Sequence, residues 1–289
     1  MTGEISEVFD RIRQRPWNSR FFTLPDWHRR YPTMLTREEM RMLAWLAQNL
    51  AVAGDIADLG CFLGGSSAAL ALGVSRSPVR RRVFSYDRFT IDEELKFRFL
   101  YQRGHGFYAG TETLPLFEKL THAFAEIVTP VSGDVREQTW SRGAIALLFI
   151  DLSKTVEIND HILRGFFGAL EAGSIVVQQD FLFYRNPWLY PTMLRLAESI
   201  EMLSHAEDNS VVFGVRRKPS PEELERCLSR HVSTTDILEA IDHFRGRFHD
   251  LRQLEMIDAL AAAVRSSPRA DKAWQFRNAA NIPVSFAEE

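Results

Sequence analysis

The sequence predicts an α/β fold in which a doubly wound, mostly parallel sheet is followed by a helical extension. Between residues 36 and 180, short apolar runs alternate with segments of helical periodicity, as expected for parallel strands buried on both faces. Two apolar segments joined by the polar turn EDNS, residues 207–210, predict a hairpin, so the last strand should run antiparallel to the others. Beyond residue 218 the pattern becomes helical.

The elements follow from local signals in chain order. Residues 1–35 show little periodicity and are rich in aromatic residues and arginines, so we expect a segment that covers another part of the molecule. A helix begins after Thr36, because Thr36 and Glu39 have the spacing of a capping box. The long connection at 92–121 is either a cover over a site or an extra helix at the sheet edge. The predicted strands lie in the runs DIADLG, RRVFSYD, EIVTPVSGD, AIALLFID and GSIVVQQD.

The helical extension, residues 219–289, begins with a second capping box, formed by Ser220 and Glu223. Apolar residues then recur at alternating spacings of four and three: Ile237, Ile241, Phe244, Phe248 and Leu251. Such a seam must be buried, either against the sheet domain, residues 36–218, or against a second copy of the chain. A homo-oligomer formed through the C-terminal helices is therefore one of two alternatives.

Composition excludes several classes of function. The chain has 289 residues and a net charge of −3 without a sustained basic block, which argues against a nucleic-acid partner. No apolar run approaches the roughly 20 residues needed to span a bilayer, and the first residues lack the apolar core of a secretory leader. The two cysteines, Cys61 and Cys227, are too few for a disulfide framework, so we expect a cytoplasmic protein that binds no membrane.

Acidic residues mark the ends of five predicted strands: Asp58, Asp87, Asp134, Asp151 and Asp180. In an open parallel sheet, ligands bind outside the carboxyl ends of the strands, where the strand order reverses. A single aspartate at such a place usually caps a helix or a turn. Five together favour a binding site at this edge of the sheet.

The turn after Asp58 is rich in glycine. Gly60, Gly64 and Gly65 would let a ligand approach the backbone, and the amides that open the next helix attract an anion. Asp87 is placed to accept hydrogen bonds from a ribose diol. The turn has neither the glycine order of the dinucleotide fingerprint, which disfavours an NAD-linked oxidoreductase, nor the Gly-Lys-Ser/Thr of a P-loop.

The segment DIADLGCFLGGSS resembles the first motif, acid-x-Gly-x-x-x-Gly, of class I S-adenosylmethionine-dependent methyltransferases, and the resemblance extends over about residues 36–218. With the strands LLFIDLSKT and VVQQDF, the chain is most similar to the macrocin O-methyltransferase group of sugar and small-molecule enzymes. The resemblance implies a seven-stranded sheet with its last strand antiparallel, and S-adenosylmethionine as cofactor. The residues it implies for the methionine moiety, the ribose and the adenine are, in turn, Asp58, Gly60 and Ser66, then Asp87, then Ser132 with Asp134.

Members of that group usually hold magnesium with one acid after the fourth strand and two adjacent acids after the fifth. Here these positions are Asp151, Gln179 and Asp180, and an amide oxygen can ligate the ion but brings no charge. Either a weakened magnesium site still orients vicinal hydroxyls, or the ion is absent and Asp151 or a histidine acts directly as the base. Lys154 is a base of lowered pKa, a cation that orients the acceptor, or a solvated surface residue.

The predicted function is an S-adenosylmethionine-dependent O-methyltransferase acting on a small molecule, a sugar or other polyhydroxylated natural product. Asp151 is the predicted base, and Lys154 and Asp180 complete the catalytic set. Tyr184 and Trp188 follow directly and either stack on the acceptor or pack in the core. N- or C-methyl transfer with the same cofactor is one alternative, and a non-catalytic scaffold, favoured by the missing acid after the fifth strand, is another.

Overall fold

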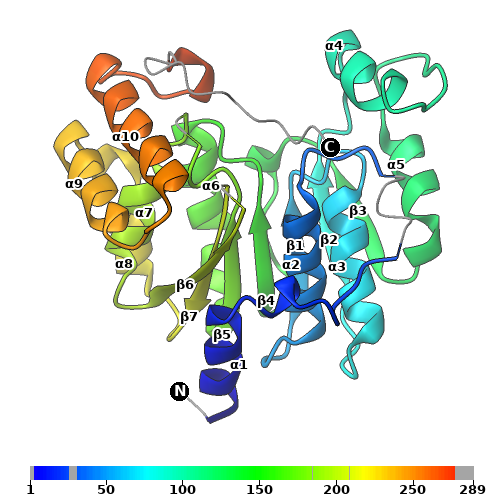
Figure 1. The fold of residues 1–289 in the computed structure, drawn as a ribbon, viewed down its shortest axis with the longest axis horizontal. Helices are drawn as coiled ribbons and strands as arrows, with labels where there is room; N and C mark the ends of the chain where they lie inside the picture. Colours follow the sequence, from blue (N-terminus) through cyan, green and yellow to red (C-terminus); the bar gives the residue numbers. More distant parts are fainter. Residues whose placement is uncertain (1–2, 26–30, 184, 208, 277–289) are drawn as a thin grey trace.

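A seven-stranded sheet forms the centre of the protein, in a computed structural model that describes residues 3–25, 31–183, 185–207 and 209–276 (Figure 1). The strand order is β3-β2-β1-β4-β5-β7-β6. The strands are β1 Asp55–Leu59, β2 Val83–Asp87, β3 Val128–Ser132, β4 Ile145–Ile150, β5 Leu170–Gln178, β6 Ile200–Ala206 and β7 Ser210–Val215. The five strands predicted from the apolar runs and the two strands of the hairpin are all confirmed.

The direction of the strands also follows the prediction. Strands β1 to β5 pair in parallel, and β7 lies antiparallel between β5 and β6. The order of the strands reverses between β1 and β4, since the chain runs outward from β1 to β3 and then returns to β4 on the other side. This reversal is the point at which α/β sheets of this kind bind ligands.

Alternation of side chains gives the sheet two separate core layers. Ile56 of β1 and Leu147 of β4 belong to the layer that holds α2 and α3. Ala57 and Leu148, the next residues of the same strands, belong to the layer that holds α6, α9 and α10. Both faces of the sheet are therefore buried, which is why its strands are continuously apolar in the sequence.

Helices cover both faces of the sheet. Two of them begin with the capping boxes that the sequence predicts, at Thr36 and Ser220. The α-helices are α1 Gly3–Arg13, α2 Arg37–Gln48, α3 Gly65–Arg76, α4 Glu93–Lys96, α5 Leu114–Thr121, α6 Val156–Gly165, α7 Leu189–Arg195, α8 Pro221–Arg226, α9 Thr234–Arg245 and α10 Leu251–Ser266. A π-helical turn spans Phe97–Tyr101. Short 3-10 turns span Pro16–Asn18, His122–Phe124, Val135–Glu137, Phe167–Ala169, Ser229–His231 and Ala273–Gln275.

The amino-terminal segment corrects one expectation. Residues 3–13 form the helix α1, whose apolar face is buried in the core rather than lying on it as an irregular segment. The buried residues are Ile5, Val8, Phe9 and Ile12. Their spacing is helical, but charged residues fill the rest of this short stretch and obscured the pattern. The helix packs beside β6.

The connection at 92–121 contains the extra helix at the sheet edge, and the alternative of a cover over a site stays a prediction. Its second half is the helix α5, which lies beside β3 at the edge of the sheet (Figure 1). Its first half packs Leu100 against Ile91 and against Leu63 of the glycine turn in a small cluster of its own. The segment therefore lies against the turn that follows β1.

The seam of the helical extension is buried against the sheet domain, which decides between the two alternatives. The ring of Phe244 lies 5.2 Å from that of Phe181 and 5.7 Å from that of Tyr190. Leu251 departs from the prediction, because it begins α10 and is 77% exposed. Self-association through other surfaces of these helices stays a prediction.

Candidate active site

The acidic residues at the strand ends lie along one edge of the sheet, where the register brings them together. Leu59, at the end of β1, pairs with Tyr86 of β2 and with Ile150 of β4, and Ile150 pairs with Gln178 of β5. The acids at or just after these ends are Asp58, Asp87, Asp134, Asp151 and Asp180. The sheet thus gathers the predicted site residues around the reversal of strand order, and the roles assigned to them stay predictions.

Asp58 is fully buried and joins β1 to the start of α3. Its Oδ2 accepts hydrogen bonds from the hydroxyls of Ser66, at 3.0 Å, and Ser67, at 2.6 Å. Its Oδ1 is buried without a hydrogen-bond partner among the described residues. Burial raises the pKa of Asp58 to about 7. One oxygen of this carboxyl is therefore committed to the fold, and the other lacks a donor.

The glycine turn is close-packed against the chain itself. Gly60 and Gly64 have φ values of +96° and +95°, which only glycine adopts readily. A Cβ on Gly60 would lie 2.8 Å from the carbonyl oxygen of Asp151, and one on Gly64 would lie 2.7 Å from the side chain of Thr121. Gly65 is as close to Thr33. Internal packing therefore explains these glycines, and the predicted approach of a ligand is not needed to account for them.

Asp87 ties the turn after β1 to the turn after β2. Its Oδ2 accepts the backbone N–H of Phe62 at 2.9 Å, and its Oδ1 accepts that of Phe89 at 2.8 Å. Both phenylalanines have positive φ, 47° and 52°, a costly conformation that surrounding structure must enforce. Burial raises the pKa of Asp87, although these backbone hydrogen bonds act in the opposite direction. The backbone N–H of Arg88 also acts as a donor to this carboxylate, whose four lone-pair sites leave room for a further donor.

Asp134 and Ser132 lie at the end of the edge strand β3. The carboxylate of Asp134 is paired with Arg88 and with Arg136, whose hydrogen bonds hold its pKa well below the ordinary range. The shorter Arg136 contact measures 2.7 Å. Ser132 is exposed. The two residues predicted to bind adenine therefore lie at the end of the edge strand. The charge of Asp134 is already balanced by two arginines.

Lys154 lies between Asp151 and Asp180. Its Nζ donates to Asp151 Oδ1 at 2.8 Å and forms a second ion pair with Asp180 Oδ2. Burial raises the pKa of Asp151 to about 6, with Asp180 acting in the same direction and Lys154 against it. Burial lowers the pKa of Lys154, but the two carboxylates outweigh it and raise the pKa above its ordinary value. Lys154 is thus a cation, which argues against one of its three alternatives, the base of lowered pKa, while its role in the site stays a prediction.

Two asparagines that the sequence analysis missed complete the surroundings of Asp180. The side-chain amide of Asn186 donates to Oδ2 at 3.3 Å, and that of Asn209 donates to Oδ1 at 3.1 Å. Asn209 comes from the turn between β6 and β7, so no spacing along the chain could indicate it. Asp180 itself has a φ of 61°, which marks a constrained backbone position.

The predicted magnesium ligands do not fit a divalent ion as they are arranged. The ammonium of Lys154 lies between the carboxylates of Asp151 and Asp180 and would repel a second cation there. The side chain of Gln179 is buried, and its Oε1 has no hydrogen-bond partner among the described residues. Within the described chain, no group of three acidic, histidine or cysteine side chains could hold a metal.

The loop that carries Lys154 is fastened from two sides. The indole N–H of Trp188 donates to the carbonyl oxygen of Ser153 at 2.9 Å. The backbone N–H of Ala273 donates to the carbonyl oxygen of Lys154 at 2.8 Å, and that of Val156 donates to Asp271 at 2.9 Å. Trp188 is buried, so packing explains it. Tyr184, the other predicted stacking residue, lies outside the described residues.

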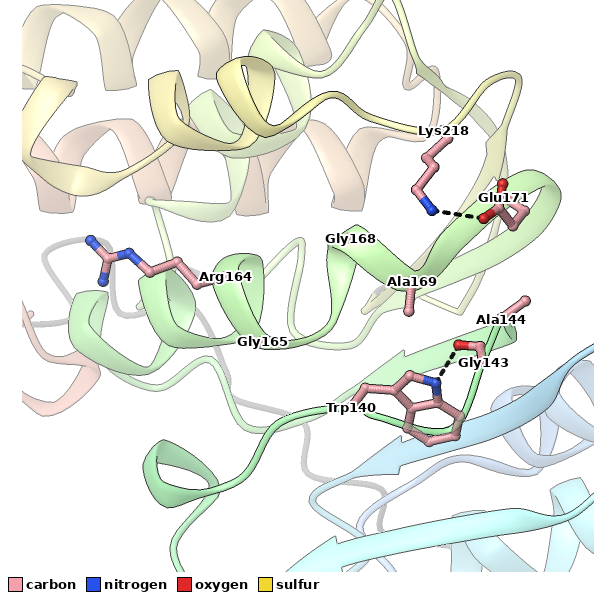
Figure 2. A pocket seen from close by; sticks show the side chains of 9 residues that line it. All are labelled: Trp140, Gly143, Ala144, Arg164, Gly165, Gly168, Ala169, Glu171 and Lys218. Atoms are coloured by element: carbon pink, nitrogen blue, oxygen red, sulfur yellow. Dashed lines mark hydrogen bonds and ion pairs between the residues drawn. The ribbon is translucent and has the colours of Figure 1, made fainter.

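A hollow of about 420 Å³ lies away from these acids. Figure 2 shows its lining, in which the indole N–H of Trp140 donates to Gly143 and Lys218 pairs with Glu171. Gly143 precedes β4 and Glu171 lies at the start of β5, so this hollow is at the amino-terminal edge of the strands. It is not part of the candidate site.

Solved structures share this architecture. The O-methyltransferase NovP is 15% identical and aligns over 74% of this chain and 100% of its own, with a TM-score of 0.51. This chain has a methyltransferase fold. CalS11, described as a TDP-rhamnose 3'-O-methyltransferase of calicheamicin biosynthesis, is 18% identical over 74% of this chain and 95% of its own, with a TM-score of 0.45. An rRNA methylase from Streptococcus thermophilus is 12% identical over 64% and 100%, with a TM-score of 0.44.

No protein-family model and no curated protein sequence matches the chain. The methyltransferase fold confirms the architecture that the motif around Asp58 implies, and the low identities make it a likeness of fold alone. Within the described residues, no helix is both long and apolar enough to cross a membrane.

Proposed function

We propose that this chain is an S-adenosylmethionine-dependent O-methyltransferase whose acceptor is a hydroxyl group of a small molecule. The observation that carries the proposal is the arrangement of Asp87. Its carboxylate is fixed by the amides of Phe62 and Phe89 at the end of β2, beside the reversal of strand order in a methyltransferase fold. A fixed carboxylate with remaining acceptor capacity at this place suits a ribose hydroxyl.

Asp58 supports the same cofactor. Its buried Oδ1 lacks a donor among the described residues, and burial raises its pKa to about 7 despite the hydrogen bonds from Ser67 and Ser66. The amino group of a methionine moiety is a cationic donor that would satisfy this oxygen. The residues present therefore fit the methionine end of the cofactor as well as its ribose.

The side chains beside β4 and β5 support O-methyl transfer. When bound, S-adenosylmethionine supplies an electrophilic methyl group, and its sulfur retains the electron pair of the broken carbon–sulfur bond. A hydroxyl acceptor must lose its proton as it forms the new bond, so a base near the acceptor oxygen is needed. Asp151 takes this proton in our proposal, and its pKa of about 6 makes it a stronger base than an ordinary aspartate.

A small, hydroxyl-rich acceptor is favoured over nucleic acid. The chain has a net charge of −3, whereas nucleic-acid-binding domains usually carry a basic surface. The likeness to NovP, which is named as an O-methyltransferase, supports a hydroxyl oxygen as the accepting atom. We therefore propose a sugar or another polyhydroxylated compound as the acceptor.

Calorimetric titration with S-adenosylhomocysteine tests the proposal directly. We expect saturable binding by the full chain and about tenfold or greater weakening in Asp87→Asn, because one lost charged hydrogen bond is worth at least 1.4 kcal/mol. Asp92→Asn is the matched control, since Asp92 caps α4 at an exposed position. Labelled S-adenosylmethionine with sugars, nucleotide sugars and polyphenols then reports methyl transfer.

Three results would contradict the proposed function. Absence of S-adenosylhomocysteine binding would favour the non-catalytic scaffold, and binding of NAD⁺ in its place would favour an oxidoreductase. Methylation of nitrogen or carbon, identified in the product by mass spectrometry and NMR, would replace the O-methyl assignment.

A further inference from the structure

The position of the Lys154 ammonium is unusual for a half-exposed lysine. Its side chain is 39% exposed, yet Nζ is held by the carboxylates of Asp151 and Asp180 from two different strand ends. Those carboxylates are 17% and 13% exposed. Pairs that are largely removed from water interact much more strongly than surface pairs.

The backbone that carries Lys154 is held as firmly as the side chain. Ala273, in the C-terminal segment, donates its N–H to the carbonyl oxygen of Lys154, and Trp188 holds the preceding carbonyl of Ser153. These contacts come from parts of the chain far from Lys154 in sequence. The ammonium is therefore placed by the fold and not by chance orientation of a flexible side chain.

The side chains that hydrogen-bond to the two carboxylates are two amides and one ammonium. Asn186 and Asn209 present side-chain N–H groups to Asp180, and Lys154 presents N–H groups to both acids. An ammonium has three N–H donors, and two of them are used. The third has no partner among the described residues and remains for an acceptor oxygen.

We propose that the Lys154 ammonium is the resident cation of this site: it holds Asp151 and Asp180 in the place of a divalent metal ion and presents its third N–H to one acceptor hydroxyl. The hydrogen bond from Lys154 to the acceptor rests on the proposed methyltransferase function, whereas its place between Asp151 and Asp180 does not. Lys154 is a positioning residue for the carboxylates.

Binding of Mn²⁺, followed by electron paramagnetic resonance of the free ion, tests the proposal on the full chain. We expect no binding by the wild-type protein at millimolar Mn²⁺. Lys154→Met leaves the two carboxylates without a cation, so it should bind Mn²⁺ at least about tenfold more tightly than wild type, in competition with Mg²⁺. Asp180→Asn added to this variant should abolish the binding.

A matched control separates this effect from a change in net charge. Lys218→Met removes the same charge at the opposite edge of the sheet, where Lys218 pairs with Glu171, and should not create an Mn²⁺ site. Lys154→Gln serves in place of Lys154→Met if the latter does not fold. S-adenosylhomocysteine affinity is measured on the same proteins.

Two outcomes overturn the proposal. One is that the wild-type protein binds Mn²⁺ and that the single variant Asp180→Asn does not. This comparison needs no lysine variant. The other is that neither Lys154→Met nor Lys154→Gln binds Mn²⁺, which would show that the two carboxylates do not form a cation site. Failure of every protein to bind S-adenosylhomocysteine counts against the proposed function and leaves the Mn²⁺ result standing.

Discussion

Aspartates at the ends of different strands have different chemical states because their partners differ. Asp58 is enclosed with two serine hydroxyls and has a pKa raised to about 7 by burial, whereas Asp134 is held ionised by two arginines. The sequence places both at strand ends but contains no sign of this difference. It depends on Arg136, two residues further along the chain, and on Arg88, which only the folded chain brings to Asp134.

Lys154 shows the same limit for the candidate site. The sequence indicates Asp151 and Asp180 through their positions after apolar runs. It leaves the state of Lys154 open, because that state depends on Asp180 and on the loop contacts made by Ala273. Such contacts join residues far apart in the chain and follow no periodicity.

A substitution at Gly60 tests the packing of the turn. Gly60→Ala should destabilise the fold more than Gly104→Ala. Both positions have positive φ, +96° and +77°, which costs an alanine roughly 1–2 kcal/mol, but only at Gly60 does the new Cβ collide with backbone, that of Asp151. Gly104 has nothing within 4 Å. Urea unfolding measures both, and equal losses would contradict the collision.

At the scale of elements, the capping boxes of α2 and α8 are the most accurate predictions, since each depends on four consecutive residues. The fold nevertheless gives their glutamates opposite pKa shifts. Burial raises the pKa of Glu39 from 4.5 to about 7, while hydrogen bonds from Arg217 lower that of Glu223 to about 2. Local sequence predicts the cap, and long-range packing decides its charge.

These shifts predict opposite effects of pH on stability. Glu39 binds its proton more tightly in the folded chain, so its contribution is full below its unfolded pKa and is lost as the pH rises through about 7. Relative to wild type, Glu39→Gln should gain roughly 3 kcal/mol of unfolding free energy between pH 4.5 and 8. Gln can still accept from Thr36 and donate to Ser210.

Glu223 serves as the counterpart in the same urea-unfolding measurements. Its pKa is lower in the folded chain, so it stabilises the fold above its unfolded pKa and loses that contribution as the pH falls toward about 2. Glu223→Gln should therefore be less stable than wild type at pH 7, with the difference shrinking in acid. The two variants should differ from wild type in opposite ways. If the unfolding free energies of both variants, relative to wild type, rise with pH or both fall with pH, the environments assigned to Glu39 and Glu223 are wrong.

At the scale of the whole molecule, the class of fold and the order of strands along the chain were predictable, because buried parallel strands and a terminal hairpin leave clear patterns. The docking of the C-terminal extension was not. Its seam fits a second copy as well as the sheet domain, and the choice depends on Phe181 and Tyr190, which pack around Phe244. The spacing of apolar residues in the seam shows that it is buried, but it does not show which surface it fits.

Shortening the chain tests how the extension acts on the site. A chain that stops after Ala270 lacks the segment that accepts from Val156 and donates to Lys154. We expect amide hydrogen exchange in residues 152–156 to accelerate about tenfold or more, with the sheet unaffected. The full chain is the reference for the exchange rates. Unchanged exchange in the shorter chain would show that these contacts do not hold the loop.

The bond between Ala273 and Lys154 also bears on how the protein is made. On the ribosome, the strands β1 to β7 emerge first and can form the sheet while the last helices are still inside the exit tunnel. The loop at 152–155 can be held by Trp188 at that stage, but the contacts with Asp271 and Ala273 form only when residues 271–276 have been released. The loop beside the acidic edge therefore takes its final form after the strands have been made, together with α9 and α10, which bury one face of the sheet.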